Sequence, residues 1–193
     1  MPTLTERHKA FAAAAITVLL WSSAFVAIRS AAEHYHPGAL ALGRLLSGSL
    51  VLVIFLLVRR EGIPPRGAWP GIVLSGVLWF GVYMVALNWG EQLVDAGTAA
   101  MIVGIGPILI ALLGGWLLGE GFPPRLMAGL AVSFAGAIVV GVSMSGDGGD
   151  SIIGVLLCLV AAATYAAGVV AQKPALRHGS ALQITAYGCF IGA

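Results

Sequence analysis

The first candidate for binding chemistry in this sequence is an arginine inside an apolar stretch. Arg44 lies in "HPGALALGRLLSGSLVLVIFLLVRR" (His36–Arg60), and the other residues from Gly38 to Val58 are uncharged. A guanidinium keeps its charge and donates several directed hydrogen bonds, so it suits a carboxylate. In a helix from Gly38 it would lie about 9 Å deep. A side chain at that depth can also snorkel to the headgroups. Its partner is therefore lipid, protein or substrate.

Polar and aromatic side chains on other apolar stretches form the second candidate set. Trp79 and Tyr83 are four residues apart and would share a helix face. Aromatic rings with a few polar groups are typical of pockets for small metabolites. Packing in a core or an interface belt is the alternative for each residue. The predicted substrate cavity is lined by Trp21, Ser22, Arg44, Trp79, Tyr83, Asn88, Thr98 and Tyr165.

The sequence predicts neither an enzyme nor a cofactor. An intramembrane hydrolase needs a buried nucleophile with a base, and a metal enzyme needs clustered His or carboxylate ligands. The buried parts of the predicted spans contain no Asp, Glu or His, unless Glu120 at an inner edge is counted, and the sequence has no phosphate-binding loop. We therefore predict no catalytic residue, no metal site and no cofactor. Without a buried acid, we also expect passive exchange or facilitated movement.

Composition indicates that these residues lie in a membrane protein. The chain is 59% hydrophobic and 9% charged, with a net charge of +2, whereas soluble domains carry about 25% charged residues. A bilayer is therefore the expected partner, and nucleic acid is not. Six apolar runs are long enough to span a bilayer, and they lie near residues 10–30, 38–58, 69–89, 95–118, 126–145 and 152–171. A seventh apolar run from Ser180 is too short to span. The predicted fold class is an all-α polytopic bundle of six transmembrane helices plus a partial seventh.

A proline inside the fourth predicted span indicates a hinge. Pro107 removes a backbone hydrogen bond, and Gly104 and Gly106 lie in the turn before it, so a kink is expected. Kinked helices often border transporter sites, although many only pack.

The loops predict orientation and a repeat. Eight of the ten basic residues fall on one side if odd-numbered spans start inside, so we place the N-terminus in the cytoplasm and the protein in the cytoplasmic (inner) membrane. Two loops on that side, "EGIPPR" (Glu61–Arg66) and "EGFPPR" (Glu120–Arg125), match at five of six positions and are predicted to be tight turns.

The number of spans before the outer linker predicts an inverted repeat. A unit of five spans starts inside and ends outside, so a second copy must be inverted. We predict a first repeat at 1–145, an outer linker at 146–150 and a second, inverted repeat starting in 151–193.

Four segments carry a family resemblance. "LLWSSAFVAIR" (Leu19–Arg29), "HPGALALGRLL" (His36–Leu46) and "VDAGTAAMIVGIGPILIALLGGWLLGE" (Val94–Glu120) resemble the EamA branch of the drug/metabolite transporter superfamily. "GVLLCLVAAATYAAGVVAQK" (Gly154–Lys173) resembles the start of that family's second repeat, where tryptophan is common at the place of Tyr165. The order and spacing of the segments carry the resemblance.

The resemblance implies a ten-helix carrier built from two inverted five-helix repeats, with both termini in the cytoplasm. Such a carrier exports small metabolites, often amino acids, by alternating access. The 193 residues would correspond to the first repeat, one further helix and part of the next. The chain then looks truncated, and a missing C-terminal half or a second copy is needed for function. A non-transporting membrane enzyme or scaffold acting on lipid-linked substrates remains the alternative.

Overall fold

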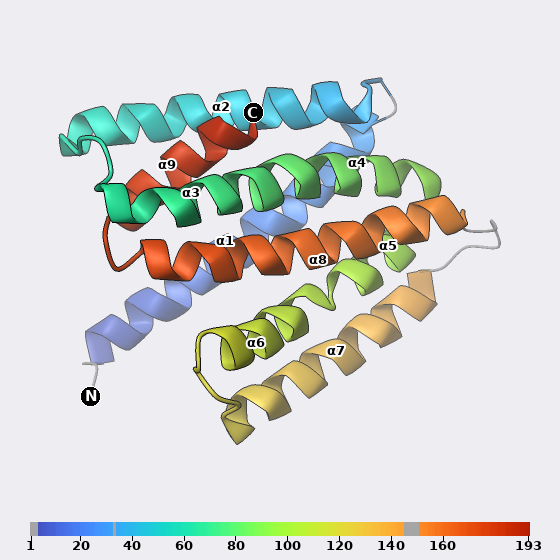
Figure 1. Ribbon diagram of the computed structural model, residues 1–193. Coiled ribbons are helices and arrows are strands. Elements are labelled where there is room, and N and C mark those ends of the chain that lie inside the picture. Colours follow the sequence, from blue (N-terminus) through green and yellow to red (C-terminus); the bar gives the residue numbers. More distant parts are fainter. Residues whose placement is uncertain (1–3, 33, 145–150) are drawn as a thin grey trace. The chain divides into compact units, whose positions relative to one another are not determined.

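The computed structural model describes residues 4–32, 34–144 and 151–193, and all regular structure in these ranges is helical. The predicted all-α class is therefore confirmed, whereas the predicted linker at 146–150 lies outside the described residues. The α-helices are α1 (Leu4–Ala32), α2 (Pro37–Arg59), α3 (Trp69–Ser75), α4 (Tyr83–Leu93), α5 (Ala96–Val103), α6 (Gly106–Leu117), α7 (Pro124–Met144), α8 (Ile152–Ala175) and α9 (Ala181–Gly192) (Figure 1). A short 3-10 helix, η1 (Arg66–Ala68), precedes α3, and a π-helix, η2 (Gly76–Val82), joins α3 to α4.

The chain divides into two compact units, one up to His36 and one from Pro37 onward. In the first unit the described structure is essentially the single helix α1. In the second unit, four helical stretches are long and apolar enough to cross a membrane: Pro37–Arg59, Arg66–Leu93, Gly97–Leu117 and Ile152–Ala175. Shorter apolar segments within the described residues are His8–Leu20, Pro124–Val139 and Ala181–Gly192. The chain is thus a helical membrane protein, and the count of six spans plus a seventh stays a prediction.

Helix α8 is the centre of the second unit. It packs against α3, η2 and α4 on one side and against α5 and α6 on the other (Figure 1). Small residues on α8 allow this close approach: a Cβ on Gly168 would lie 2.7 Å from Cβ of Trp79, and one on Gly154 would lie 2.7 Å from Cβ of Leu93. Helix association in lipid relies on van der Waals packing and interhelical hydrogen bonds, and small residues permit the close backbone approach that such packing needs. Packing around α8 therefore positions the aromatic residues of the neighbouring helices.

Small residues elsewhere behave differently. Gly71 and Ser75 of α3 do pack closely, because a Cβ on Gly71 would lie 2.7 Å from the carbonyl oxygen of Ala171, and Ser75 is fully buried. In contrast, Cβ atoms on Gly43 of α2 and Gly129 of α7 would meet nothing within 4 Å. A small-residue pattern permits close contact, but it does not determine which helix faces meet.

The π-helix is a feature that the sequence pattern did not predict. Over Gly76–Val82 the helix widens, and the backbone N–H of Tyr83 bonds to the carbonyl of Leu78, five residues earlier. Such widened turns occur often at functional sites. Here the widened turn leads directly from Trp79 to Tyr83, and both rings contact the same residue of α8, as described below.

The contact at Gly168 gives a stability prediction. We expect Gly168→Leu to destabilise the chain by about 1–3 kcal/mol, because the new side chain would overlap the backbone and Cβ of Trp79. Gly129→Leu is the matched control, since that helical position is exposed and open. Thermal unfolding in detergent measures both. Equal unfolding temperatures for the two variants would show that α8 does not pack tightly on η2.

Three loops lie together at one end of the second unit, which we call the turn end: residues 60–65, 118–123 and 176–180. Hydrogen bonds and an ion pair connect the first two loops to α8 and α9 near the third. The opposite end holds Leu93, whose carbonyl accepts a bond from the backbone of Ser151. The basic residues at or beside the turn end are Arg59, Arg60, Arg66, Arg125, Lys173 and Arg177.

Candidate functional site

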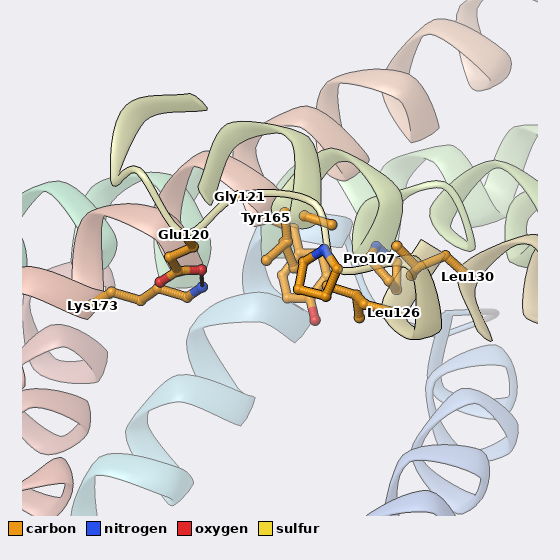
Figure 2. Close-up of a pocket in the computed structure, with 10 residues that line it drawn as sticks. Pro107, Glu120, Gly121, Leu126, Leu130, Tyr165 and Lys173 are labelled. Carbon is orange, nitrogen blue, oxygen red and sulfur yellow. Dashed lines mark hydrogen bonds and ion pairs between the residues drawn. The ribbon is translucent and has the colours of Figure 1, made fainter. Parts of the chain in front are cut away.

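A cavity of about 380 Å³ lies between α6, the start of α7 and α8 (Figure 2). Its walls are mostly apolar, with one phenol and one pair of opposite charges among them. This is the usual composition of a small-molecule site, in which a few polar groups orient a ligand within an apolar pocket. The lining residues are Pro107, Ile110, Ala111, Glu120, Gly121, Pro123, Leu126, Leu130, Tyr165 and Lys173.

One wall of the cavity begins where a membrane-spanning helix is interrupted. Helix α5 ends at Val103 and α6 begins at Gly106, with Pro107 in its first turn. Proline fits there because the first N–H groups of a helix have no intrahelical partner. A Cβ on Gly106 would lie 2.8 Å from the ring of Tyr165, so this ring packs on the interruption itself. The break lies where the sequence predicts a kink, and the role of Gly104, Gly106 and Pro107 as a hinge stays a prediction.

The charged pair of the cavity joins the turn after α6 to the last turns of α8. Nζ of Lys173 lies 2.7 Å from Oε2 of Glu120 (Figure 2). Gly119 (φ +68°) and Gly121 (φ +72°) flank Glu120 in the left-handed conformation that glycine accepts without strain. The pair lies over Gly114, where a Cβ would come within 3.0 Å of the carboxylate and 3.3 Å of the ammonium. Three glycines thus shape the place of this ion pair.

The exposure of the ion pair limits its contribution to stability. The side chains of Lys173 and Glu120 are 34% and 49% exposed, and such pairs contribute about 0–1 kcal/mol. Its position in the cavity wall is therefore more informative than its energy. Sequence reasoning left both residues out of the site. The signal that could have indicated Glu120 is its place in the duplicated E-G-x-P-P-R turn.

Three of the predicted cavity residues meet in an aromatic cluster. The ring of Tyr165 on α8 lies 5.6 Å from that of Trp79 and 5.5 Å from that of Tyr83, measured between centroids. Trp79 also stacks on Phe80 at 5.0 Å. Tyr165 lines the cavity, and Tyr83 is buried behind it. The cluster therefore connects the cavity wall on α8 to the widened helix η2 and to α4.

Arg44 is bonded to protein. Its Nη1 donates to Oδ1 of Asn88 at 3.1 Å, and Nδ2 of Asn88 donates to the carbonyl of Pro37 at 3.2 Å. Asn88 is fully buried. Arg44 also interacts electrostatically with Tyr83, whose ring contacts Tyr165. The ring contact between Tyr165 and Tyr83 and the electrostatic interaction between Tyr83 and Arg44 thus link the cavity wall to Arg44.

Arg44 also has an acidic neighbour, Glu91, that lies beyond the predicted span 69–89. Helix α4 extends to Leu93, beyond the predicted end of the span, and so includes Glu91. Glu91 follows Asn88 by one helical turn, is half-buried, and interacts electrostatically with Arg44. Its atom Oε1 is shielded from solvent. The expectation of passive exchange or facilitated movement, which rests on the absence of a buried acid, stays a prediction.

A comparison with protein families decides the class of this chain. The EamA-like transporter family matches residues 8–142, which include the interrupted helix, Arg44 and the aromatic pair of η2 and α4. The chain belongs to the EamA-like transporter family.

Several curated relatives of this EamA-like chain are transporters by name. It is 37% identical over 189 residues to the "Probable terminal-alkyne amino-acid exporter" of Streptantibioticus cattleyicolor, covering 95% of this chain and 61% of the relative. It is 38% identical over 143 residues to the uncharacterized transporter YdfC of Bacillus subtilis, covering 74% and 46%. It is 29% identical over 153 residues to the uncharacterized inner membrane transporter YedA of Escherichia coli, covering 79% and 49%. The chain thus spans about half to three-fifths of the length of these relatives. No solved structure matches it.

Thr98, another predicted cavity residue of this EamA-like chain, does not line the cavity. Thr98 is buried at the start of α5, where its hydroxyl donates to Oδ2 of Asp95 at 2.8 Å and its N–H donates to Oδ1 at 3.0 Å. Asp95 is the N-cap residue of that helix. Thr98 therefore takes part in capping the start of α5. Trp21 and Ser22 lie in α1, in the other unit, and their side chains are outside the described residues.

Proposed function

We propose that this chain forms part of a secondary transporter that exports small metabolites, such as amino acids, by alternating access. The observation that carries the proposal is the cavity of about 380 Å³ beside the interrupted helix α5–α6, in a chain of a transporter family. Interrupted helices border many transporter sites because their ends leave backbone groups for a ligand and allow the halves to move. The cavity is the proposed substrate site.

The lining of the cavity favours a zwitterionic substrate. An amino acid carries an ammonium and a carboxylate, which are complementary to Glu120 and Lys173, and Tyr165 offers an aromatic surface for a side chain. The relative from Streptantibioticus cattleyicolor is named as an amino-acid exporter. In this proposal Tyr83 supports the ring of Tyr165 from behind, and Arg44 contacts the substrate when the cavity opens toward α4.

The repeat organisation is part of the same proposal. Residues 1–145 form a first five-helix repeat, 146–150 a linker, and 151–193 the beginning of an inverted second repeat in a ten-helix fold. The central place of α8, which packs on both α3–α4 and α5–α6, favours this arrangement, because a cavity between repeats needs a helix of the second repeat against helices of the first. The relatives are longer than the matched region, which is in keeping with further helices.

We propose further that the turn end faces the cytoplasm, as the N-terminus does, in the cytoplasmic membrane. Six basic residues lie at or beside this end, and Glu91 and Asp95 lie toward the other. Loops rich in Lys and Arg stay on the cytoplasmic side during insertion.

A cavity-filling substitution tests the proposed function. We expect proteoliposomes with the complete gene product to take up radiolabelled amino acids by counterflow. Ala111→Trp should reduce this uptake more than about tenfold, because the indole would occupy the cavity that Ala111 lines. Val132→Trp is the matched control, since Val132 is 74% exposed on α7 and away from the cavity. Equal uptake by the two variants, or no flux of any amino acid in the parent protein, would reject the proposal.

A further inference from the structure

The duplicated E-G-x-P-P-R turns make contacts that a simple connecting turn would not need. In the first turn, the carboxylate of Glu61 accepts a hydrogen bond from the hydroxyl of Ser180. The carbonyl of Gly62 accepts a second bond, 2.9 Å long, from Nε2 of Gln183. Ser180 and Gln183 form the capping box of α9, in which each side chain bonds to the backbone of the other. The first turn therefore holds the beginning of α9 through both of its capping residues.

The second turn holds the end of α8. Glu120 has the same position in its turn as Glu61, and its carboxylate pairs with Lys173. Lys173 and Ser180 lie on the two sides of the corner between α8 and α9, which we define as residues 173–183. The two turns connect different helices, because one joins α2 to η1 and the other joins α6 to α7. Both glutamates nevertheless reach the same corner.

The backbone of the two turns is alike at the residue before each glutamate. Arg60 has φ +54° and Gly119 has φ +68°, so both are in the left-handed region. This conformation is strained for an arginine and suits a helix end. Each turn thus begins with a left-handed residue and presents the following glutamate to the corner. The duplicated sequence places a glutamate at the corner twice, although the two partners, Ser180 and Lys173, differ.

We propose that the two E-G-x-P-P-R turns form a two-point latch on the α8–α9 corner, which keeps the turn end of the cavity closed. This inference rests on the proposed function, in which the cavity opens and closes during transport. Glu120 and Lys173 are themselves part of the cavity wall, so separating them widens the cavity toward the turn end. Both contacts are partly accessible to solvent, so water can replace them when the latch opens.

Accessibility of a reporter cysteine tests the latch without requiring transport. Ala111→Cys places a thiol in the cavity wall, and the native Cys158 and Cys189 are buried, so the parent chain gives the background. The complete gene product carrying this reporter is treated in membrane vesicles with a membrane-impermeant maleimide from the turn-end side. We expect slow labelling, and a rate roughly 1.5- to 5-fold higher for each glutamate changed to alanine, the range expected when a solvent-accessible charged contact is lost.

Two further variants make the result specific. Exchanging the charges with Glu120→Lys and Lys173→Glu should restore slow labelling, because the ion pair is rebuilt in reverse. Arg125→Gln removes a charge from the same turn without changing the pair and should leave the rate unchanged. Unchanged labelling in Glu61→Ala/Glu120→Ala, or equally fast labelling in the charge exchange and in Glu120→Lys alone, would overturn the latch. A transporter without the latch would fail this test and still show the flux described above.

Discussion

Arg44→Ala should reduce transport by about tenfold or more, and Arg44→Lys should not restore it. Nη1 of the guanidinium donates a hydrogen bond to the buried Oδ1 of Asn88 at 3.1 Å, and hydrogen bonds to charged groups contribute about 1.5–3 kcal/mol. Alanine leaves that oxygen without its donor in a buried place, so we also expect a loss of about 1–3 kcal/mol in stability. Lysine keeps the charge, but its ammonium lacks the planar group of arginine, whose fixed N–H donors can bond to more than one acceptor. Counterflow uptake and thermal unfolding in detergent measure the two effects.

A double-mutant cycle provides the control for Arg44. Asn88→Ala removes the acceptor, so Arg44→Ala should cost less stability in that background, with a coupling of about 0.5–3 kcal/mol. Full transport by Arg44→Lys would show that charge alone is required. Full transport and unchanged stability in Arg44→Ala would favour an anchor at the membrane surface, with the bond to Asn88 incidental.

Tyr165→Ala is the substitution with the second largest expected effect. The ring contacts both Trp79 and Tyr83, and it packs on the glycine at the start of α6. Two aromatic pairs at about 0.5–1.5 kcal/mol each predict a loss of about 1–3 kcal/mol in stability. The cavity wall would lose its aromatic surface as well, so uptake should fall together with stability.

Tyr165→Phe separates the ring from its hydroxyl. We expect this variant to keep the stability of the parent chain, because both ring contacts remain. Its uptake then shows whether the hydroxyl contacts substrate: reduced uptake at normal stability indicates a polar contact in the cavity. If Tyr165→Ala unfolds at the same temperature as the parent chain, the aromatic cluster does not hold α8 against η2 and α4.

The amino-acid sequence by itself determined the class of the protein and most helix positions. A bilayer needs about 20 apolar residues per span and leaves no partner for an unpaired backbone group. Apolar runs between charged loops therefore predict helices directly, as they do for α2 and α8. Proline and glycine have equally local effects, so the interruption at Pro107 follows the sequence closely. The pair Trp79 and Tyr83 was also predictable, because neighbours four residues apart share a helix face.

Tertiary structure decided which of these residues meet. Asn88 was expected in a cavity, but packing buries it completely between Arg44 and Pro37. Glu91 lies beyond the predicted span 69–89, but α4 packs against α8, extends to Leu93 and so includes this residue. Glu120 and Lys173 are 53 positions apart, and only the folding of α8 across α6 brings them to one cavity. Helical periodicity is local, whereas a contact between helices depends on how whole faces fit, and that information is distributed over the packed residues of both.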